Sequence, residues 1–332
     1  MDKVNVVVLA PKGSPAGTDK IVDLMKTHSN LNVIVGTSAE ELGAEVCLNA
    51  DGLILWWAFR DAARAFWKLA EPETRGRLRW VHSTFAGIDA MLFPELVECD
   101  KVTMTLTRGV FSNSLAEWVT MAMLYLGKDV LRLNANKKAH KYEKYVVTEV
   151  KGQTMAVVGY GDIGRACGYK AHALGLHVIG VKTHGEPATD GVADAIVGID
   201  ELLTVLPKAD YVTLVLPLTD KTRGLFGREA FAAMKPSAFL INIGRGATVD
   251  DDAFVEALRE HKIAGAALDV FSTEPLPPEN PLWDIENVLM SPHCADATKT
   301  YTTEAGDLTL VEVARFAKGE PLLYIANKKA GY

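Results

Sequence analysis

The 332-residue sequence has few cysteines, no long apolar run and no surplus of basic residues. Its four cysteines (Cys47, Cys99, Cys167 and Cys294) form neither a CxxC pair nor another metal-ligand spacing, which predicts reduced thiols, no metal site and a cytoplasmic protein. No apolar run approaches the ~18 residues that a membrane-spanning helix requires. The net charge of −7 provides no basic surface for nucleic acid or for a membrane, so neither is expected as a partner.

The sequence does contain a regular alternation of short apolar strands and amphipathic helices, which is typical of a parallel sheet covered on both faces. The N-terminal stretch MDKVNVVVLAPKG lacks the long apolar region of a signal peptide and instead predicts a first strand, VNVVVLA. Further strands are predicted at NVIVG and GLILWW, and then at TMAVVGYG, LHVIGV, DYVTLVL, SAFLINIG, IAGAALDV and NVLMSP.

The later six strands predict one doubly wound domain between residues 107 and 293. Residues 1–106 and 294–332 are each short for a domain, so we expect them to form a second, discontinuous domain together. The predicted fold class is therefore α/β with two Rossmann-like domains, in which a doubly wound parallel-sheet domain is inserted in a flavodoxin-like domain.

A long apolar helix is predicted to open with a capping box made by Ser114 and Glu117. Its sequence, WVTMAMLYLGKDVLRL, is too apolar for a helix with one exposed face. The helix therefore lies in the core or packs on a second subunit, and the sequence leaves both possibilities open.

A glycine-rich turn follows the strand TMAVV directly, with Gly159, Gly161 and Gly164 in the pattern G-x-G-x-x-G and the helical sequence RACGYKAHALG behind it. The pattern alone is weak evidence, but a position between strand and helix is the context that dinucleotide binding requires. The first glycine permits the tight turn, the second lets the backbone approach a pyrophosphate, and the third allows close packing of helix and strand. The helix N-terminus offers free amides to the phosphates.

The next strand, HVIGV, ends at Lys182, at the place where an acidic residue is expected to bind the adenosine ribose. A lysine attracts a 2′-phosphate instead, and Thr183 and His184 add two potential donors. The sequence thus favours NADP over NAD, the alternative being a solvent-facing lysine that has no part in the choice of cofactor.

Three polar residues follow later strands: Arg245 comes after LINI, Glu274 after AALDV, and His293 after NVLM. Because the carboxyl ends of parallel strands lie at one edge of a sheet, we expect these residues on the same side as the glycine loop. Taken singly, each is more often an ion-pair partner or a structural histidine. Together beside a nicotinamide, they form a coherent site for hydride transfer to a carbonyl.

The sequence resembles the NAD(P)-dependent D-isomer-specific 2-hydroxyacid dehydrogenases, in particular the glyoxylate/hydroxypyruvate reductases, over essentially its whole length. The matching stretches are VVGYGDIGRACG, LVLPLTDKTRGL, INIGRGATVDDDAFVEAL, IAGAALDVFSTEPLP and SPHCADAT, and HSTFAGIDAM resembles the family's substrate loop. The resemblance implies that residues 107–293 bind the cofactor and that residues 1–106 and 294–332 bind the substrate. It also implies reduction of a small 2-oxoacid to the D-2-hydroxyacid, and a homodimer that pairs through the helix from Leu115 to Leu133.

The same resemblance implies a role for each site residue. His293 would be the acid/base, Glu274 would raise its pKa by a hydrogen bond, and Arg245 would orient the 2-oxoacid. Main-chain amides of the substrate loop would bind the substrate carboxylate, at Phe85, Ala86 and Gly87. Asp269 would accept a hydrogen bond from the nicotinamide carboxamide. Further cofactor contacts are implied at Asp162, Ile163, Leu216, Pro217, Thr222, Ile243 and His293.

Bulky residues near the substrate loop predict a narrow pocket for glyoxylate, hydroxypyruvate or pyruvate: Trp56, Trp57, Phe59 and Phe85. His82 either contacts the substrate or is structural. Arg108 is a candidate second cation, and Cys294 is a packing residue or an oxidation-sensitive thiol.

Other activities remain open as alternatives. A nicotinamide-sensing corepressor and a phosphoglycerate dehydrogenase share the motifs. A formate dehydrogenase is disfavoured by the acid at Glu274, because that branch resembles a glutamine–histidine pair there. A methyltransferase would leave Arg245, Glu274 and His293 unexplained.

Overall fold

The computed structural model describes residues 3–12 and 18–332, and the chain divides into two compact units. The first unit comprises residues 1–110 and 299–332, and the second comprises residues 111–298. The domain boundaries predicted from the sequence, at 106/107 and 293/294, lie a few residues before these. The two units are described separately below.

The first unit contains a parallel sheet with the strand order β2-β1-β3-β4-β5, the flavodoxin-like order. Its strands are β1 (Val4–Leu9), β2 (Leu31–Gly36), β3 (Gly52–Leu55), β4 (Trp80–Ser83) and β5 (Thr103–Leu106). Its helices are α1 (Thr18–Lys26), α2 (Ala39–Leu42), α3 (Ala44–Leu48), α4 (Arg60–Ala70), α5 (Pro94–Glu98) and α12 (Tyr301–Lys318).

Alternate side chains of this sheet are buried on opposite faces, as expected for a sheet with helices on both sides. Val6 and Val8 of β1 pack in one apolar cluster with residues of α1 and α12. Val7 and Leu9 pack in the other cluster, with Phe66 of α4. Each fully buried aliphatic side chain stabilises the fold by about 1.5–3 kcal/mol, which explains why β1 is a nearly continuous apolar run.

The sequence does not predict β4 and β5, because polar side chains interrupt both strands. His82 of β4 is fully buried, and its two ring nitrogens lie 2.8 Å from the hydroxyl of Thr105 and 3.1 Å from that of Thr309. Burial lowers the pKa of His82 to about 3, so the imidazole is neutral in the folded protein. His82 is therefore a structural residue of the first unit.

We expect acid to destabilise the first unit through His82. Between pH 6.5 and pH 3 the unfolded chain binds a proton at this position and the folded chain does not. The free energy of unfolding should therefore fall with decreasing pH, by up to about 1.4 kcal/mol per pH unit. Urea denaturation at pH 7 and pH 5 would measure this, and the His82→Gln variant, less stable at pH 7, should show a weaker pH dependence. Equal pH dependence of both proteins would contradict the prediction.

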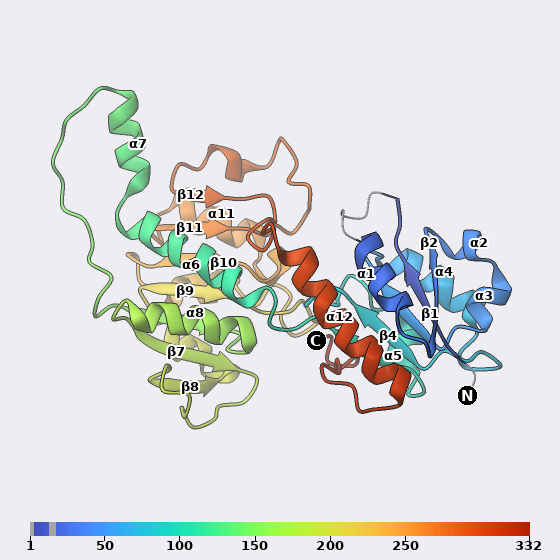
Figure 1. The fold of residues 1–332 in the computed structure, drawn as a ribbon. Coiled ribbons are helices and arrows are strands. Elements are labelled where there is room, and N and C mark those ends of the chain that lie inside the picture. Colours follow the sequence, from blue (N-terminus) through green and yellow to red (C-terminus); the bar gives the residue numbers. More distant parts are fainter. Residues whose placement is uncertain (1–2, 13–17) are drawn as a thin grey trace. The chain divides into compact units, whose positions relative to one another are not determined.

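The second unit contains a parallel sheet with the strand order β12-β11-β10-β9-β6-β7-β8 (Figure 1). Its strands are β6 (Thr154–Val158), β7 (His177–Lys182), β8 (Ala195–Gly198), β9 (Tyr211–Leu214), β10 (Phe239–Asn242), β11 (Gly265–Leu268) and β12 (Val288–Met290). Its helices are α6 (Ser112–Gly127), α7 (Val130–Lys138), α8 (Asp162–Ala173), α9 (Leu202–Val205), α10 (Arg228–Ala233) and α11 (Asp251–Arg259). The order reverses between β6 and β9, which makes this pair the switch point of a doubly wound sheet.

The predicted α/β fold class is confirmed in both sheets. The edge strand β8 was not predicted, because AIVG is short and only partly buried, and it follows a polar loop. Ala156 and Val158 of β6 are buried against the cluster that includes α9, α10 and α11. Val157 faces the other side, close to Gly164 of α8. Both faces of this sheet are therefore covered.

The predicted capping box at Ser114 is wrong. The helix begins two residues earlier, at Ser112, and the Ser114 hydroxyl donates a hydrogen bond to the carbonyl oxygen of Ala295 at 2.5 Å. The single helix expected from Leu115 to Leu133 is also wrong. Asp129 has left-handed backbone angles (φ 50°) and its carboxylate caps a new helix, so α6 ends at Gly127 and α7 begins at Val130.

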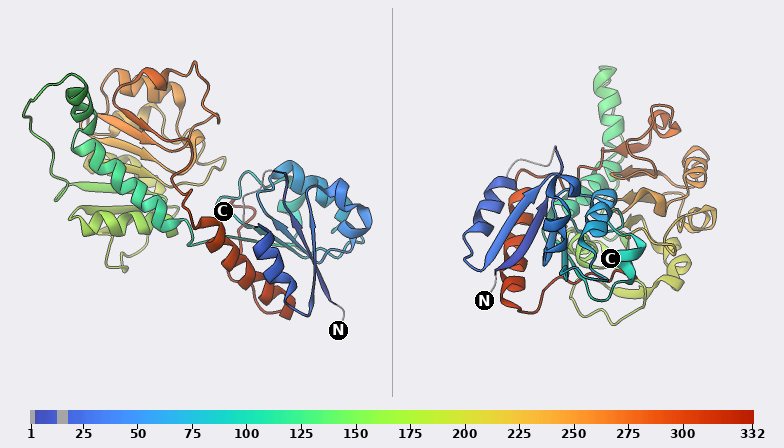
Figure 2. Two further views of the ribbon diagram at one scale, coloured as in Figure 1. Left: turned by 45° about the horizontal axis from the view of Figure 1, so that its top comes forward. Right: turned by 90° about the vertical axis from the view of Figure 1, so that its right-hand side faces the viewer.

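Helix α6 buries one face within the second unit, whereas α7 buries no residue. Helix α7 and the extended segment after it stand out from the rest of this unit in Figure 1, and the right-hand view of Figure 2 shows the helix projecting from it. We call residues 130–149 the arm. Arg132 holds it together, because its guanidinium lies 4.3 Å from the ring centroid of Tyr145 and 3.0 Å from Glu143. None of the described helices is long and apolar enough to cross a membrane.

Candidate active site

The residues predicted to form the site follow the carboxyl ends of the strands of the second unit. Gly159 comes directly after β6, Ile243 after β10 and Asp269 after β11, while Lys182 is the last residue of β7. His293 lies shortly after β12. Because all these strands are parallel, their carboxyl ends share one edge of the sheet, and this edge is the usual ligand site of doubly wound folds.

The glycine loop has the geometry that the pattern predicts. Gly159 has φ 101°, and a side chain there would collide with the carbonyl oxygen of Val215 across the switch point. A side chain at Gly164 would collide with the carbonyl of Gly159, so α8 can approach β6 only with glycine here. At Gly161, by contrast, a Cβ would meet no atom within 4 Å. The loop therefore leaves open space next to its backbone, which fits a pyrophosphate.

The N-terminus of α8 faces this space. Gly161 is its N-cap and supplies no side-chain hydrogen bond, so the first amides of the helix, at Asp162 and Ile163, can receive an anion. The carboxylate of Asp162 points elsewhere and accepts a hydrogen bond from Ser112 at 2.5 Å. The residues present therefore fit a dinucleotide phosphate.

Four further residues predicted to contact the cofactor follow β9 and β10. Leu216 is half-buried and Ile243 is buried. The hydroxyl of Thr222 donates a hydrogen bond to the carbonyl of Pro217 at 2.7 Å, which fixes the turn after β9. Their contacts with a cofactor remain predictions.

His293 and Glu274 form a hydrogen-bonded pair, with 2.7 Å between Nδ1 and Oε2. The other carboxylate oxygen of Glu274 accepts a hydrogen bond from the Phe271 amide at 2.8 Å, so the carboxylate is held in place. Partial burial alone would raise the pKa of Glu274, but the hydrogen bonds outweigh it and lower that pKa. The hydrogen bond to Glu274 raises the pKa of His293 against the opposing effect of burial. The pair is thus arranged to keep a proton on the imidazole.

Arg245 lies beside this pair. Its charge is close enough to influence the ionisation of both His293 and Glu274. The Thr248 hydroxyl and the Asn242 side-chain amide both donate to the Arg245 carbonyl, at 2.7 and 3.2 Å. The three residues that the sequence singled out therefore come together, on segments that hydrogen bonds hold.

Asp269 positions the histidine loop. It is 1% exposed, and its carboxylate accepts hydrogen bonds from the Ser291 hydroxyl at 2.6 Å and from the amides of Cys294 and Ala295. The backbone of His293 has φ 48°, a conformation that costs energy for a non-glycine residue and often marks a functional site. Sequence reasoning missed Ser291, because a single serine in a loop carries no pattern, and it assigned Ser114 of α6 to a helix cap instead of the hydrogen bond to Ala295. The contact of Asp269 with a nicotinamide remains a prediction.

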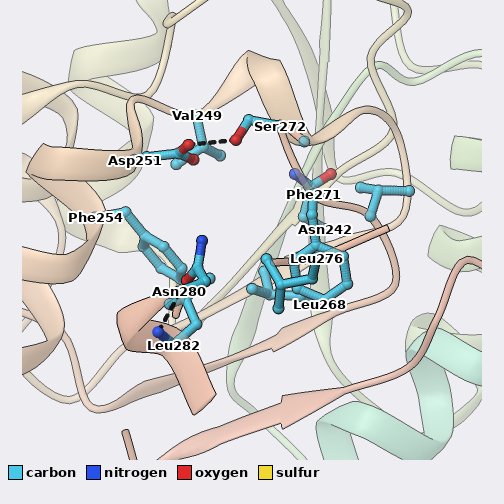
Figure 3. Close-up of a pocket in the computed structure, with 12 residues that line it drawn as sticks. Asn242, Val249, Asp251, Phe254, Leu268, Phe271, Ser272, Leu276, Asn280 and Leu282 are labelled. Carbon is cyan, nitrogen blue, oxygen red and sulfur yellow. Dashed lines mark hydrogen bonds between the residues drawn. The ribbon is translucent and has the colours of Figure 1, made fainter. Parts of the chain in front are cut away.

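A cavity of about 20 Å³, large enough for about one water molecule, is lined in part by Phe271, Ser272 and Leu276, which flank Glu274 in the chain (Figure 3). Phe254 and Leu282 are among its apolar lining residues, and Ser272 closes one side by a hydrogen bond to Asp251. This cavity is too small for a substrate. Its walls pack the segment that carries Glu274 against β11 and α11.

In the first unit, aromatic side chains surround the loop after β4. The ring centroid of Phe85 lies 5.1 Å from that of Trp57 and 5.8 Å from that of Phe59. Trp57 and Phe59 also line an open pocket of about 540 Å³, and Trp57 has φ 57°. Trp56 is different: it is 2% exposed in the core, so the expectation that it narrows a pocket is wrong.

The predicted substrate loop offers two amides rather than three. The Phe85 amide already donates to the Ser83 hydroxyl at 3.1 Å. Ala86 and Gly87 are half-buried beside it.

The remaining candidates lie at the surface. Lys182 forms an ion pair with Glu186, while Thr183, His184 and Arg108 are exposed. Cys294 is exposed, and partial burial with nearby carboxylates raises the pKa of its thiol, which disfavours the reactive thiolate.

Comparison with known proteins agrees with this geometry. Residues 120–295 match the family model of the D-isomer specific 2-hydroxyacid dehydrogenase, NAD binding domain. Glyoxylate/hydroxypyruvate reductase B of Pectobacterium carotovorum is 37% identical over 67% of this chain and 70% of its own length. Glyoxylate reductase of Thermofilum pendens is 33% identical over 75% of each chain.

Solved structures are similar along the whole chain. A probable 2-hydroxyacid dehydrogenase of Rhizobium etli in complex with NADP has a TM-score of 0.82 and 26% identity, and covers 100% of both chains. The NADPH-dependent glyoxylate/hydroxypyruvate reductase of Sinorhizobium meliloti has a TM-score of 0.80 at 26% identity, covering 99% of this chain and 100% of its own. This chain therefore belongs to the family of NAD(P)-dependent D-isomer specific 2-hydroxyacid dehydrogenases.

Proposed function

We propose that the protein reduces a small 2-oxoacid, such as glyoxylate or hydroxypyruvate, to the D-2-hydroxyacid, with NADPH preferred over NADH. The observation that carries the proposal is the 2.7 Å His293–Glu274 pair beside Arg245, at the sheet edge that also holds the glycine loop. The names of the relatives support the substrate class, since several are glyoxylate or glyoxylate/hydroxypyruvate reductases.

His293 acts as the general acid in reduction. The nicotinamide cofactor, when bound, supplies the hydride that reaches the carbonyl carbon. His293 donates its proton to the carbonyl oxygen, and it takes that proton back in the oxidation direction. Glu274 stabilises the protonated imidazole and fixes its tautomer, because Nδ1 donates to the carboxylate and Nε2 remains for the substrate.

Arg245 binds and orients the substrate. Its planar guanidinium suits the carboxylate and the carbonyl oxygen of a 2-oxoacid, which it can bind with two parallel hydrogen bonds. We assign the other carboxylate oxygen to the amides of Ala86 and Gly87. We also assign substrate binding to residues 1–106 with 294–332, and cofactor binding to residues 107–293.

Lys182 supports the preference for NADPH. It ends β7, where the adenosine ribose is expected, and its ammonium attracts a 2′-phosphate. The relatives from Rhizobium etli and Sinorhizobium meliloti were crystallised with NADP, which supports the same choice.

Initial rates with NADPH and NADH, across glyoxylate, hydroxypyruvate, pyruvate and phenylpyruvate, test the proposal. We expect the highest kcat/KM with NADPH and one of the first two acids. Absence of turnover in a protein that binds the dinucleotide would overturn it in favour of a nicotinamide sensor.

We further propose a cytoplasmic homodimer. The four free cysteines fit a reducing compartment. The arm offers an apolar surface to a second copy, since Tyr142 is 96% and Val146 97% exposed. Val146→Glu should shift the mass in light scattering from dimer to monomer, because a buried unpaired charge is costly. The control is Leu203→Glu, at an exposed leucine on α9, and a dimer that survives Val146→Glu would contradict the arm's role.

A further inference from the structure

The lysine at the end of β7 has an acidic neighbour that the sequence pattern does not reveal. Lys182 Nζ lies 2.6 Å from a carboxylate oxygen of Glu186. Both side chains are partly exposed, at 32% and 47%. The positive charge that favours a 2′-phosphate is therefore already neutralised by an acid on the same loop.

The backbone holds Glu186 at this position. Its amide donates a hydrogen bond to the carbonyl of Ile196 in β8, at 3.3 Å, and Gly185 packs closely on Gly198. The loop after Glu186 is anchored as well. Asp190 accepts a hydrogen bond from Tyr160 of the glycine loop, at 2.9 Å, and caps the amides of two later residues.

Tyr160 makes this anchor rigid. It is 1% exposed and packs against Gly180 of β7, where a side chain would overlap its ring. The glycine loop, the end of β7 and the Glu186 loop are thus tied together. The backbone at Glu186 therefore has a fixed place, from which its side chain reaches Lys182.

We propose that Glu186 is a specificity-determining residue for the cofactor, whose carboxylate competes with a 2′-phosphate for Lys182. The inference rests on the proposed function, which puts the adenosine ribose at the end of β7. With NADPH, the phosphate displaces Glu186 from the lysine. With NADH, the carboxylate is the acceptor that a free 2′-hydroxyl needs, a role that an acid at position 182 would otherwise have. The pair thus restrains the preference for NADPH and lets the site accept both cofactors.

Removing the Glu186 charge is expected to change the affinity for a 2′-phosphate moderately, because both Lys182 and Glu186 are partly exposed. Exposed ion pairs are weak, so a phosphate with its larger charge can displace the carboxylate. A carboxylate a few ångströms from a phosphate also repels it. Removing this charge should tighten binding of a 2′-phosphate about 5- to 20-fold.

Isothermal titration of the full chain with adenosine 2′,5′-bisphosphate and 5′-AMP tests the proposal without turnover. In Glu186→Gln we expect the bisphosphate to bind at least about fivefold tighter. Binding of 5′-AMP should change by less than about twofold, because the glutamine keeps an amide oxygen that can accept from the 2′-hydroxyl. Lys182→Met should weaken the bisphosphate, and in that background the gain from Glu186→Gln should shrink to about twofold or less. Titration with NADPH and NADH should show the same change in their ratio.

The control is Glu260→Gln. Glu260 is an exposed acid paired with a lysine, Lys262, and it follows α11, far from β7 in the strand order. The Glu260→Gln substitution removes the same charge and should change the affinity for neither ligand. Unchanged bisphosphate binding in Glu186→Gln would overturn the inference, as would an undiminished gain without Lys182. A folded wild-type protein that binds neither dinucleotide would overturn the proposed function along with it.

Discussion

Replacing His293 with alanine is expected to lower kcat for 2-oxoacid reduction about 100- to 10,000-fold. The variant loses the proposed proton donor of the reaction. It keeps the glycine loop and the anchoring of the histidine loop, because Asp269 binds Ser291 and the backbone amides of residues 294 and 295. Steady-state rates with saturating NADPH measure the loss.

Two further measurements make this result specific. NADPH binding by fluorescence titration should change little in His293→Ala, since the proposed phosphate site lies at the start of α8. The matched control is Cys294→Ala, which alters the adjacent exposed side chain and should keep most of the activity. A His293→Ala enzyme with near-normal kcat would rule out the acid/base role.

Replacing Glu274 with glutamine is expected to move the alkaline limit of reduction to lower pH and to lower kcat about 10- to 100-fold at neutral pH. In the proposed mechanism reduction requires protonated His293, so its rate falls as pH rises through the pKa of the imidazole. Glu274 raises this pKa. The neutral amide stabilises the imidazolium less, so the pKa falls and the loss of activity begins at lower pH. In the oxidation direction, which needs the neutral imidazole, the acid limb should move to lower pH as well.

The pH profile distinguishes this role from a structural one. Glutamine retains an oxygen that can accept from the Phe271 amide, so the loop should keep its conformation. Glu279→Gln, at an exposed acid of the same segment, is the control and should leave the profile unchanged. An unshifted profile in Glu274→Gln would mean that this carboxylate does not set the pKa of His293.

The common position of the site residues at one edge of the sheet could be predicted from the sequence, because each of them follows an apolar strand of a parallel sheet. The glycine loop could also be predicted, because its spacing marks the positions, Gly159 and Gly164, where any side chain would collide with neighbouring backbone. Strands with continuous apolar sequence were predicted. The strand around His82 was not, because its buried polar side chain is satisfied by Thr309, far away in sequence.

What the sequence could not predict depends on contacts between distant segments or on a single residue. The anchoring of Ala295 by Ser114 joins residues 181 positions apart. The break between α6 and α7 depends on the left-handed backbone of Asp129. The pairing of Lys182 with Glu186 depends on the path of the loop before β8. None of these leaves a periodic pattern.

The Ser114–Ala295 hydrogen bond also bears on how such proteins can be recombined. It joins the beginning and the end of the second unit, so the chain enters and leaves this unit at neighbouring points. A segment with adjacent ends can be exchanged as one cassette, because the recipient chain has to open only at a single loop. Grafting between relatives at residues 110/111 and 298/299 would therefore transfer the glycine loop, the Lys182–Glu186 pair and His293 together, and we expect it to exchange cofactor preference while the loop after β4 stays that of the recipient.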